Sequence, residues 1–388
     1  MKKKILIIVP GLYFGGTNRS LFNLLEKMAD DESMAIDVLA MDMRGEYLSK
    51  KKDYSFLKED FKLLGSFTFG DSVKSEGFIQ ATKRFTSKVL FKIFYKGDIN
   101  ELYQSAAKKY SNKYDSVIAF QEGHATQFAS YVESENKIAW VRCDYSKYIS
   151  RFCTGFTEAN TYKKFNKIVC VSDYTASVFR GIYPELGGRT IAVHNIIDTE
   201  GIIADSRKEL DSELDTSKFR IISVGRMDPV KRFSYIPEMA QKMVRGGCQF
   251  KWYIVGAGGE EYDKVRERIR ELKMENYVIL LGAKSNPYPY IASSNVLVCP
   301  SVSEACPNVV NEAKILHVPV VAADFPSAVE FVDNGKNGII TPIDEMAEHL
   351  IRIVKDGDFY QMLKNGISTF EYNNGEIKEK IKSILSGE

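Results

Sequence analysis

Short apolar runs alternate along this chain with segments whose apolar positions recur every three to four residues. Residues 5–9 form a continuous aliphatic run, which predicts a buried strand. Gly15 and Gly16 follow, residues 18–28 have the spacing of an amphipathic helix, and residues 37–41 form a second apolar run. The order strand, glycine turn, helix and strand indicates a βαβ unit, and therefore a parallel sheet.

The same alternation continues to the C-terminal region. Further strands are expected at residues 116–120, 137–141, 167–171, 190–193, 220–224, 250–255, 277–281, 296–299 and 319–322. The polar segment at residues 199–218 has no strong period and is the candidate linker between two domains. We therefore expect an α/β protein with an N-terminal Rossmann-like domain at residues 1–199 and a C-terminal one at 200–370. Residues 371–388 form a charged amphipathic helix that is a candidate to pack back on the first domain.

Composition narrows the class of protein. A chain of 388 residues with 44% hydrophobic and 27% charged residues suits two globular domains. A formal net charge of +2 argues against nucleic acid as a partner. The first apolar run is too short for a signal peptide, and no run approaches the roughly 20 residues of a membrane span. The six cysteines form no C-x-x-C pair, which favours reduced thiols and a cytoplasmic protein.

Residues 78–95 mix lysine and arginine with large apolar side chains. Between residues 50 and 113, basic residues outnumber acidic ones by fourteen to seven. One interpretation is an amphipathic face that touches anionic lipid, which would place the protein peripherally on the inner face of the membrane. The other is an ordinary helix packed on the sheet with a solvated basic side.

Two carboxylates stand on either side of an expected strand-to-helix turn. Glu304 follows the strand at residues 296–299, and Glu312 lies about one turn into a helix for which Pro307 suits the first position. Ligands of open α/β sheets bind at this carboxyl edge, so both carboxylates are candidate binding groups. The alternative is that both are solvated surface residues.

Two cations follow the strand at residues 220–224. Arg226 and Lys231 lie behind Gly225 and suit a diphosphate group, although they could also be plain surface cations. The glycines near Gly256 lack the G-x-G-x-x-G spacing, which disfavours a dehydrogenase. Walker A, HExxH, G-x-S-x-G and clustered Cys/His patterns are absent from the sequence.

These motifs together resemble the donor-binding domain of retaining GT-B glycosyltransferases of family four (glycosyl transferases group 1). The resemblance spans roughly residues 221–342 and is carried in order by Gly225, Arg226, Lys231, Gly256, Gly282, Glu304, Glu312, Glu330 and Gly338. It implies two Rossmann-like domains that face each other across a cleft.

By the same resemblance, a nucleotide-diphospho-sugar is the donor. Arg226 and Lys231 would hold the diphosphate, Glu304 the sugar and Glu312 the ribose. Arg226, Lys231 and Glu304 are the expected catalytic residues. The further donor-binding candidates are Gly16, Gly225, Gly256, Ala283, Lys284, Cys306, Pro307, Asn308 and Val309. Neither a metal nor a cofactor is implied.

The chain departs from the family pattern on the acceptor side. Many relatives have Trp-x-His-x-Asp where this chain has Trp140, Arg142 and Asp144. Arginine cannot act as a base at neutral pH, but it could bind an acidic or phosphate-bearing acceptor. Glu122, His124 and Asp144 are the other acceptor-side candidates, each with a structural role as the alternative.

The sequence thus favours a retaining hexosyltransferase of cell-surface polysaccharide biosynthesis. A UDP-sugar is the first expectation for the donor and GDP-mannose the second, with a glycan, polymer or lipid-linked acceptor. The alternatives are a nucleotide-sugar epimerase or phosphorylase on the same scaffold, and a catalytically silent subunit that binds glycan or sugar nucleotide.

Overall fold

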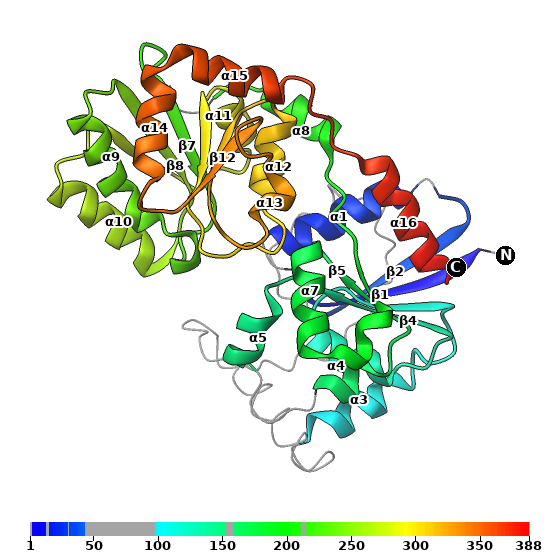
Figure 1. Ribbon diagram of the computed structural model, residues 1–388. Helices are drawn as coiled ribbons and strands as arrows, with labels where there is room; N and C mark the ends of the chain where they lie inside the picture. The colour runs from blue at the N-terminus through cyan, green and yellow to red at the C-terminus, as the bar shows by residue number, and fades with distance from the viewer. Residues whose placement is uncertain are drawn as a thin grey trace. The chain divides into compact units, whose positions relative to one another are not determined.

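The computed structural model describes residues 2–12, 15–29, 31–42, 98–152, 158–210 and 214–387. The chain forms two compact units (Figure 1). The first unit contains residues Met1–Ile196 together with Asn374–Glu388, and the second contains Ile197–Asn373. Residues 78–95, for which the sequence suggested a lipid contact, lie outside the described residues.

The first unit is built on a six-stranded parallel sheet of order β2-β1-β3-β4-β5-β6. Strand β1, which lies between β2 and β3, is apolar from Ile5 to Val9 because helices cover such a sheet on both faces, and these residues are at most 1% exposed. The strands are β1 (Lys3–Gly11), β2 (Met34–Asp42), β3 (Ser116–Ala119), β4 (Asn136–Val141), β5 (Lys167–Cys170) and β6 (Thr190–Ala192). The helices are α1 (Gly16–Ala29), α3 (Ile99–Ala107), α4 (His124–Tyr131), α5 (Tyr145–Phe152), α6 (Glu158–Tyr162), α7 (Asp173–Ile182), the 3-10 helix η2 (Pro184–Arg189) and α16 (Asn374–Ser386).

The terminal helix α16 packs on the first unit through its own C-terminal end. The Ser116 hydroxyl donates to the Leu385 carbonyl at 2.6 Å, and the Asn136 amide donates to the Ile384 carbonyl at 2.9 Å. The last carbonyls of a helix have no partner within the helix, so these two side chains satisfy groups that would otherwise need water. An ion pair between Lys382 and Asp31 at 2.9 Å adds a contact from the side of the helix.

The second unit is built on another six-stranded parallel sheet, of order β12-β11-β10-β7-β8-β9. Figure 1 shows α9 and α10 on one side of this sheet and α11 and α12 on the other. The strands are β7 (Phe219–Val224), β8 (Phe250–Val255), β9 (Val278–Gly282), β10 (Val296–Cys299), β11 (Val320–Ala323) and β12 (Gly338–Thr341). The helices are α8 (Thr199–Ser206), η3 (Pro229–Lys231), η4 (Phe233–Tyr235), α9 (Ile236–Arg245), α10 (Gly259–Glu271), α11 (Tyr288–Ala292), α12 (Asn308–Ile315), α13 (Ala328–Phe331), α14 (Met346–Lys355) and α15 (Gly357–Ile367).

A buried polar chain joins three strands at the centre of this second sheet. The indole of Trp252, which is fully buried, donates to the Ser223 hydroxyl at 3.1 Å. Ser223 in turn donates to the carbonyl of Val298 at 2.8 Å. Each buried polar group therefore has a partner, which removes the penalty of placing an indole N–H and a hydroxyl in the core.

The two parallel α/β sheets confirm the fold class expected from the apolar pattern. Two local elements were not predicted. The candidate linker at residues 199–218 contains α8, which Asp198 caps by accepting from the Gly201 amide at 3.0 Å. Because only Ile202 of α8 is buried, the helix leaves almost no periodic signal in the sequence.

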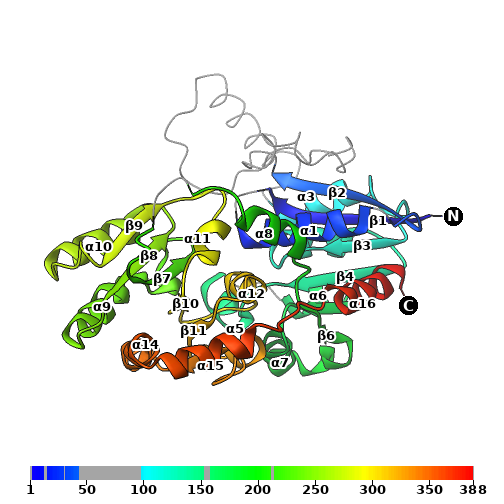
Figure 2. The same cartoon turned by 90° about the horizontal axis from the view of Figure 1, so that it is seen from above.

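The second element that the apolar pattern did not indicate is the edge strand β12, which follows a turn at residues 333–337. The Asn337 side chain closes this turn by donating to Asp333 at 2.9 Å, and β12 then pairs with β11. A Cβ at Gly338 would lie 2.4 Å from the Val320 carbonyl oxygen, so close strand packing explains this glycine. Among the helices of the described ranges, none is both long and apolar enough to traverse a bilayer. Figure 2 shows α9 and α10 of the second unit lying beside each other.

Candidate functional site

Two loops meet at the point where the strand order of the second unit reverses. From the centre of the sheet, the strand order is β7, β8, β9 toward one edge and β10, β11, β12 toward the other edge. Strands β7 and β10 are therefore neighbours at the centre. The loop after β7 carries Arg226 and Lys231, and the loop after β10 carries Glu304. Ligands of open α/β sheets bind at such a reversal, outside the carboxyl ends of the strands.

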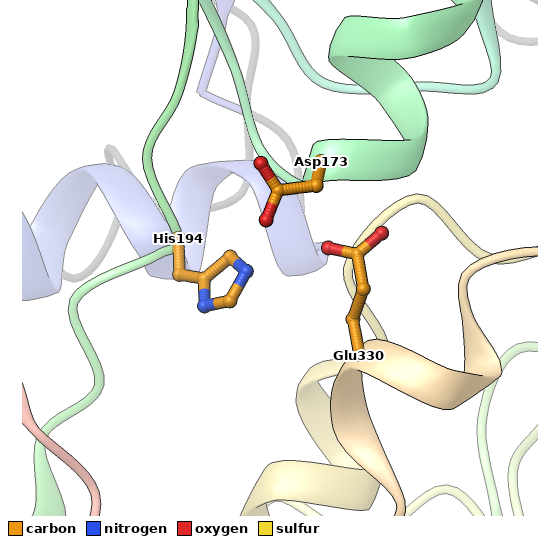
Figure 3. A group of neighbouring side chains, drawn as sticks. All are labelled: Asp173, His194 and Glu330. Atoms are coloured by element: carbon orange, nitrogen blue, oxygen red, sulfur yellow. The ribbon is translucent and has the colours of Figure 1, made fainter.

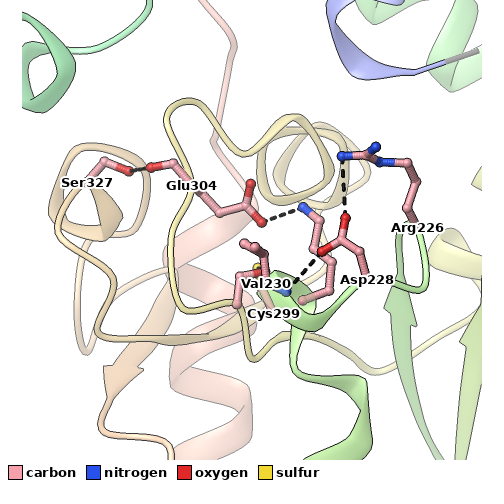
Figure 4. A network of polar contacts seen from close by, with 8 residues as sticks. Arg226, Asp228, Val230, Cys299, Glu304 and Ser327 are labelled. Carbon is pink, nitrogen blue, oxygen red and sulfur yellow. Dashed lines mark hydrogen bonds and ion pairs between the residues drawn. The ribbon is translucent and has the colours of Figure 1, made fainter. Parts of the chain in front are cut away.

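An ion pair joins these two loops. Lys231 Nζ lies 2.6 Å from Glu304 Oε1, and the two side chains are only 20% and 12% exposed (Figure 4). Burial alone would lower the pKa of Lys231, but the Glu304 carboxylate, with Cys299 and Asp228, holds it above its ordinary value. Lys231 is therefore charged at neutral pH, and the structure brings together two of the three expected catalytic residues.

Arg226 has a different environment in the same loop. Its guanidinium Nη2 lies 3.4 Å from Asp228 Oδ2, and its side chain is 76% exposed (Figure 4). Asp228 also accepts from the backbone N–H of Val230 at 3.0 Å and so caps the short helix η3 that presents Lys231. Arg226 thus reaches into solvent at the edge of the site, whereas Lys231 is fixed within it.

Hydrogen bonds to backbone carbonyls hold the two loops in place independently of the ion pair. The N–H of Val302 donates to the Val230 carbonyl at 2.9 Å. The hydroxyl of the fully buried Ser327 donates to the Glu304 carbonyl at 2.7 Å. Sequence reasoning missed Ser327, and no local pattern marks it, because the contact joins the loops after β10 and β11 across 23 positions.

Helix α12 begins within this site. Pro307 stands at its N-cap, one position before the first-turn position that the sequence suggested. Glu312 is 5% exposed, and the Tyr288 hydroxyl of α11 donates to its Oε1 at 3.5 Å. Cys306, Asn308 and Val309 are half-buried around the start of the helix.

Lys314 fastens the inner side of α12. Its ammonium donates to the Phe331 carbonyl at 2.6 Å and lies 4.1 Å from the centre of the Phe370 ring. Burial lowers the pKa of Lys314 to about 8. Sequence reasoning did not identify this buried lysine. It anchors α12, the helix on which Glu312 lies, to the last residue of α13.

The remaining donor-side candidates of this unit lie after neighbouring strands. A Cβ at Gly256 would lie 2.1 Å from the Gly225 carbonyl oxygen, so the glycine at position 256 is required by contact between two loops. Ala283 is exposed after β9, and the Lys284 ammonium lies 5.3 Å from the centre of the Tyr290 ring. Gly16, in the first unit, is the first residue of α1.

The four acceptor-side candidates lie after β3 and β4, at the carboxyl edge of the first sheet. The backbone N–H of Arg142 donates to Glu122 Oε2 at 2.9 Å, while its guanidinium donates to Asn195 Oδ1 at 2.6 Å and lies 4.3 Å from the centre of the Phe120 ring. Asp144, which is buried, accepts from Ser146 at 2.7 Å and from Tyr174 at 3.3 Å. Asn195 was not among the assigned site residues.

The two histidines at this edge, His124 and His194, have different neighbours. His124 opens α4, and its Nδ1 lies 3.1 Å from the Tyr103 hydroxyl of α3. His194, after β6, has a ring nitrogen within 4.8 Å of a carboxylate oxygen of Asp173, at the start of α7 (Figure 3). Glu330, also labelled in Figure 3, belongs to α13 of the second unit. Sequence reasoning did not place Asp173 near His194, because these residues follow different strands.

Solved structures share this architecture along the whole chain. HepE of Anabaena, in complex with UDP and glucose, superposes with a TM-score of 0.72 at 18% identity and covers 100% of both chains. TarM superposes with a TM-score of 0.72 at 15% identity and covers 99% of each chain. The protein therefore has the GT-B fold of these glycosyltransferases.

Residues 218–356 match the family model of the glycosyl transferases group 1. A 4-alpha-N-acetylgalactosaminyltransferase of Campylobacter jejuni that acts on a diphospho-undecaprenol-linked sugar is 30% identical over 181 residues, 46% of this chain and 47% of its own. The poly(ribitol-phosphate) alpha-N-acetylglucosaminyltransferase of Staphylococcus aureus is 26% identical over 211 residues, 52% of this chain and 41% of its own. The aligned parts thus span about half the length of these curated relatives.

Proposed function

We propose that this protein is a metal-independent retaining glycosyltransferase that moves a hexose or N-acetylhexosamine from a nucleotide-diphospho-sugar to a surface glycan. The observation that carries the proposal is the placement of Lys231 and Glu304 within 2.6 Å of each other at the strand reversal. A cation and a carboxylate side by side suit a ligand that joins a diphosphate to a sugar, because one group matches the phosphates and the other the hydroxyls.

In this proposal, each donor contact has a separate task. Lys231, assisted by Arg226 at the edge of the site, neutralises charge that grows on the departing diphosphate. Glu304 accepts hydrogen bonds from sugar hydroxyls, and Glu312 accepts them from the ribose. Amides of the first turn of α12 add donors and the positive end of the helix dipole near the phosphates.

The retaining course follows from positioning. The bond between the anomeric carbon and the diphosphate breaks, and the departing phosphate oxygen accepts the acceptor's proton. The acceptor oxygen then bonds to the anomeric carbon on the face that the diphosphate leaves. Fixed charges around the donor lower the barrier because they are oriented before the reaction begins. Lys231 and Glu304, fixed between two hydrogen-bonded loops, are suited to this task.

The relatives support a UDP-sugar as the first choice of donor, and GDP-mannose stays the second choice from the sequence. HepE is solved with UDP and with UDP-glucose, and the two characterised transferases above act with N-acetylhexosamines. One of these acts on a lipid-linked acceptor and the other on a phosphate polymer. For this chain we propose a glycan, polymer or lipid-linked acceptor, with Arg142 facing an acidic or phosphate-bearing group.

The direct test incubates the protein with a panel of UDP- and GDP-sugars and follows release of the nucleoside diphosphate, first without and then with candidate acceptors. The anomeric configuration of the product reports retention, and activity in excess EDTA reports metal independence. Lys231→Met is expected to reduce transfer about a hundred-fold or more, because a charge contact to the transition state is lost. Asp324→Asn, an exposed carboxylate after β11, is the matched control and is expected to retain activity.

The same experiment separates the alternatives. An epimerase would convert the donor alone into a second sugar nucleotide, and a phosphorylase would require inorganic phosphate. A binding subunit would bind the donor with no turnover on any acceptor. Full transfer activity in Lys231→Met would show that the site has been assigned wrongly.

A further inference from the structure

Each cation of the proposed diphosphate site already forms an ion pair with a nearby carboxylate of the protein. Lys231 is paired with Glu304 at 2.6 Å, and Arg226 with Asp228 at 3.4 Å. The formal charges of these four groups cancel. A diphosphate that binds here therefore competes with carboxylates that already occupy the cations.

The competition is strongest at Lys231. Its ammonium and the Glu304 carboxylate are mostly withdrawn from solvent, with 20% and 12% of their side chains exposed, so water screens them less than a surface pair. A phosphate oxygen at hydrogen-bond distance from the same Nζ would lie within about 5 Å of the carboxylate, where like charges repel. The diphosphate and the carboxylate thus disfavour each other on one ammonium.

From this geometry we infer that Glu304 is an internal competitor of the diphosphate and that the two exchange places on Lys231. Diphosphate binding displaces the carboxylate, and the released carboxylate then becomes the acceptor for sugar hydroxyls. This inference rests on the proposed function. It makes sugar recognition conditional on the nucleotide part of the donor, because Glu304 is engaged with Lys231 until the phosphates arrive.

The scaffold allows this exchange without moving the loops. The Glu304 backbone is held by the buried Ser327 hydroxyl at 2.7 Å, and the two loops are joined by the hydrogen bond from Val302 to Val230 at 2.9 Å. Neither contact involves the Glu304 carboxylate. The side chain can therefore rotate while its backbone stays in place, and Glu304→Gln should keep the fold of the loop.

The test measures binding of UDP and of GDP by isothermal titration calorimetry, without sugar. The proteins are the wild type, Glu304→Gln, Lys231→Met, the double variant and the control Asp324→Asn. We compare the proteins with whichever of UDP and GDP the wild type binds more tightly. We expect Glu304→Gln to bind that nucleotide about ten-fold more tightly than the wild type, because a competing charge is removed. Lys231→Met should bind it about ten-fold more weakly.

The double variant decides whether the effect acts through Lys231. It should bind like Lys231→Met, since Glu304 has no ammonium left to compete for, and Asp324→Asn should stay within about two-fold of the wild type. Transfer by Glu304→Gln should fall despite its tighter UDP or GDP binding, a combination that loss of structure does not produce.

Two outcomes separate this inference from the proposed function. If the wild type binds nucleotide and Lys231→Met weakens it, but Glu304→Gln binds equally or more weakly, then the exchange is wrong and the proposed function stands. If the wild type binds neither nucleotide and releases none from any sugar nucleotide, then the proposed function fails and the exchange fails with it.

Discussion

Substitution of Gly256 tests how closely the loops after β7 and β8 pack against each other. A Cβ added there would lie 2.1 Å from the Gly225 carbonyl oxygen, far inside van der Waals contact. Neither side can yield easily: the Gly256 N–H donates to Gly282 at 2.9 Å, and the Gly225 N–H donates to Val255 at 3.0 Å. Gly256→Ala must therefore push apart two backbone segments that are both tied to the sheet edge.

The cost follows from this geometry. Overpacking by one methyl group against fixed backbone costs about 1–3 kcal/mol. For a domain of about 150–250 residues each kcal/mol is worth about 2–4 °C, so we expect the melting temperature to fall by about 2–12 °C. Because Gly225 leads directly into Arg226 and Lys231, the displaced backbone should also raise the KM for the donor.

Thermal unfolding without any ligand is the primary assay, since it separates packing from donor contact. Gly357→Ala is the matched control in the same unit: its Cβ would meet nothing within 4 Å, and it lies at the first position of α15. That change should be neutral or stabilising by up to about 1 kcal/mol. An unchanged melting temperature for Gly256→Ala would refute the close approach of the two loops.

Three further predictions concern single side chains. Ser327→Ala removes the hydroxyl that holds the Glu304 carbonyl at 2.7 Å, so unfolding free energy should fall by about 1 kcal/mol and the kcat of sugar transfer should fall as well; unaltered values of both would contradict this anchor. Lys314→Met tests the buried ammonium, whose pKa burial lowers from 10.5 to about 8. The unfolded chain binds more protons between these pH values, so the wild type should gain stability relative to the variant as pH rises from 8 to 10.5, by at most about 3 kcal/mol. Urea unfolding of both proteins at pH 7 and pH 10 measures this, and a stability difference independent of pH would count against it. Arg142→Lys loses the planar contact with Asn195 at 2.6 Å, so the acceptor KM should rise several-fold while donor hydrolysis is unchanged; kinetics with varied acceptor decide, and equal acceptor KM values would remove Arg142 from the acceptor side.

The apolar runs predicted the strands of both sheets well because buried parallel strands must be apolar on both faces. The runs at residues 5–9 and 296–299, for example, became β1 and β10. The apolar pattern missed elements where that pressure is weak. Helix α8 buries one large side chain, Ile202, and the edge strand β12 begins with a glycine selected by close packing against Val320.

In the candidate site, too, some residues could be predicted from the sequence and others could not. Strand-end positions identified Lys231 and Glu304, because residues after parallel strands gather at one edge of a sheet. Their pairing at 2.6 Å could not be predicted, since it depends on the strand order that makes β7 and β10 neighbours. Ser327 and Lys314 were missed because their partners are backbone carbonyls, which leave no mark in a sequence.

By itself, the sequence determined the two parallel sheets, the glycine turns and the chemical types available at each strand end. These follow from local periodicity and from the demand that buried strands be apolar. The tertiary structure alone decided which of those groups meet. It placed the Glu304 carboxylate on the Lys231 ammonium and the Gly225 carbonyl against Gly256, because the order of strands in a sheet is fixed by long-range packing and not by neighbours along the chain.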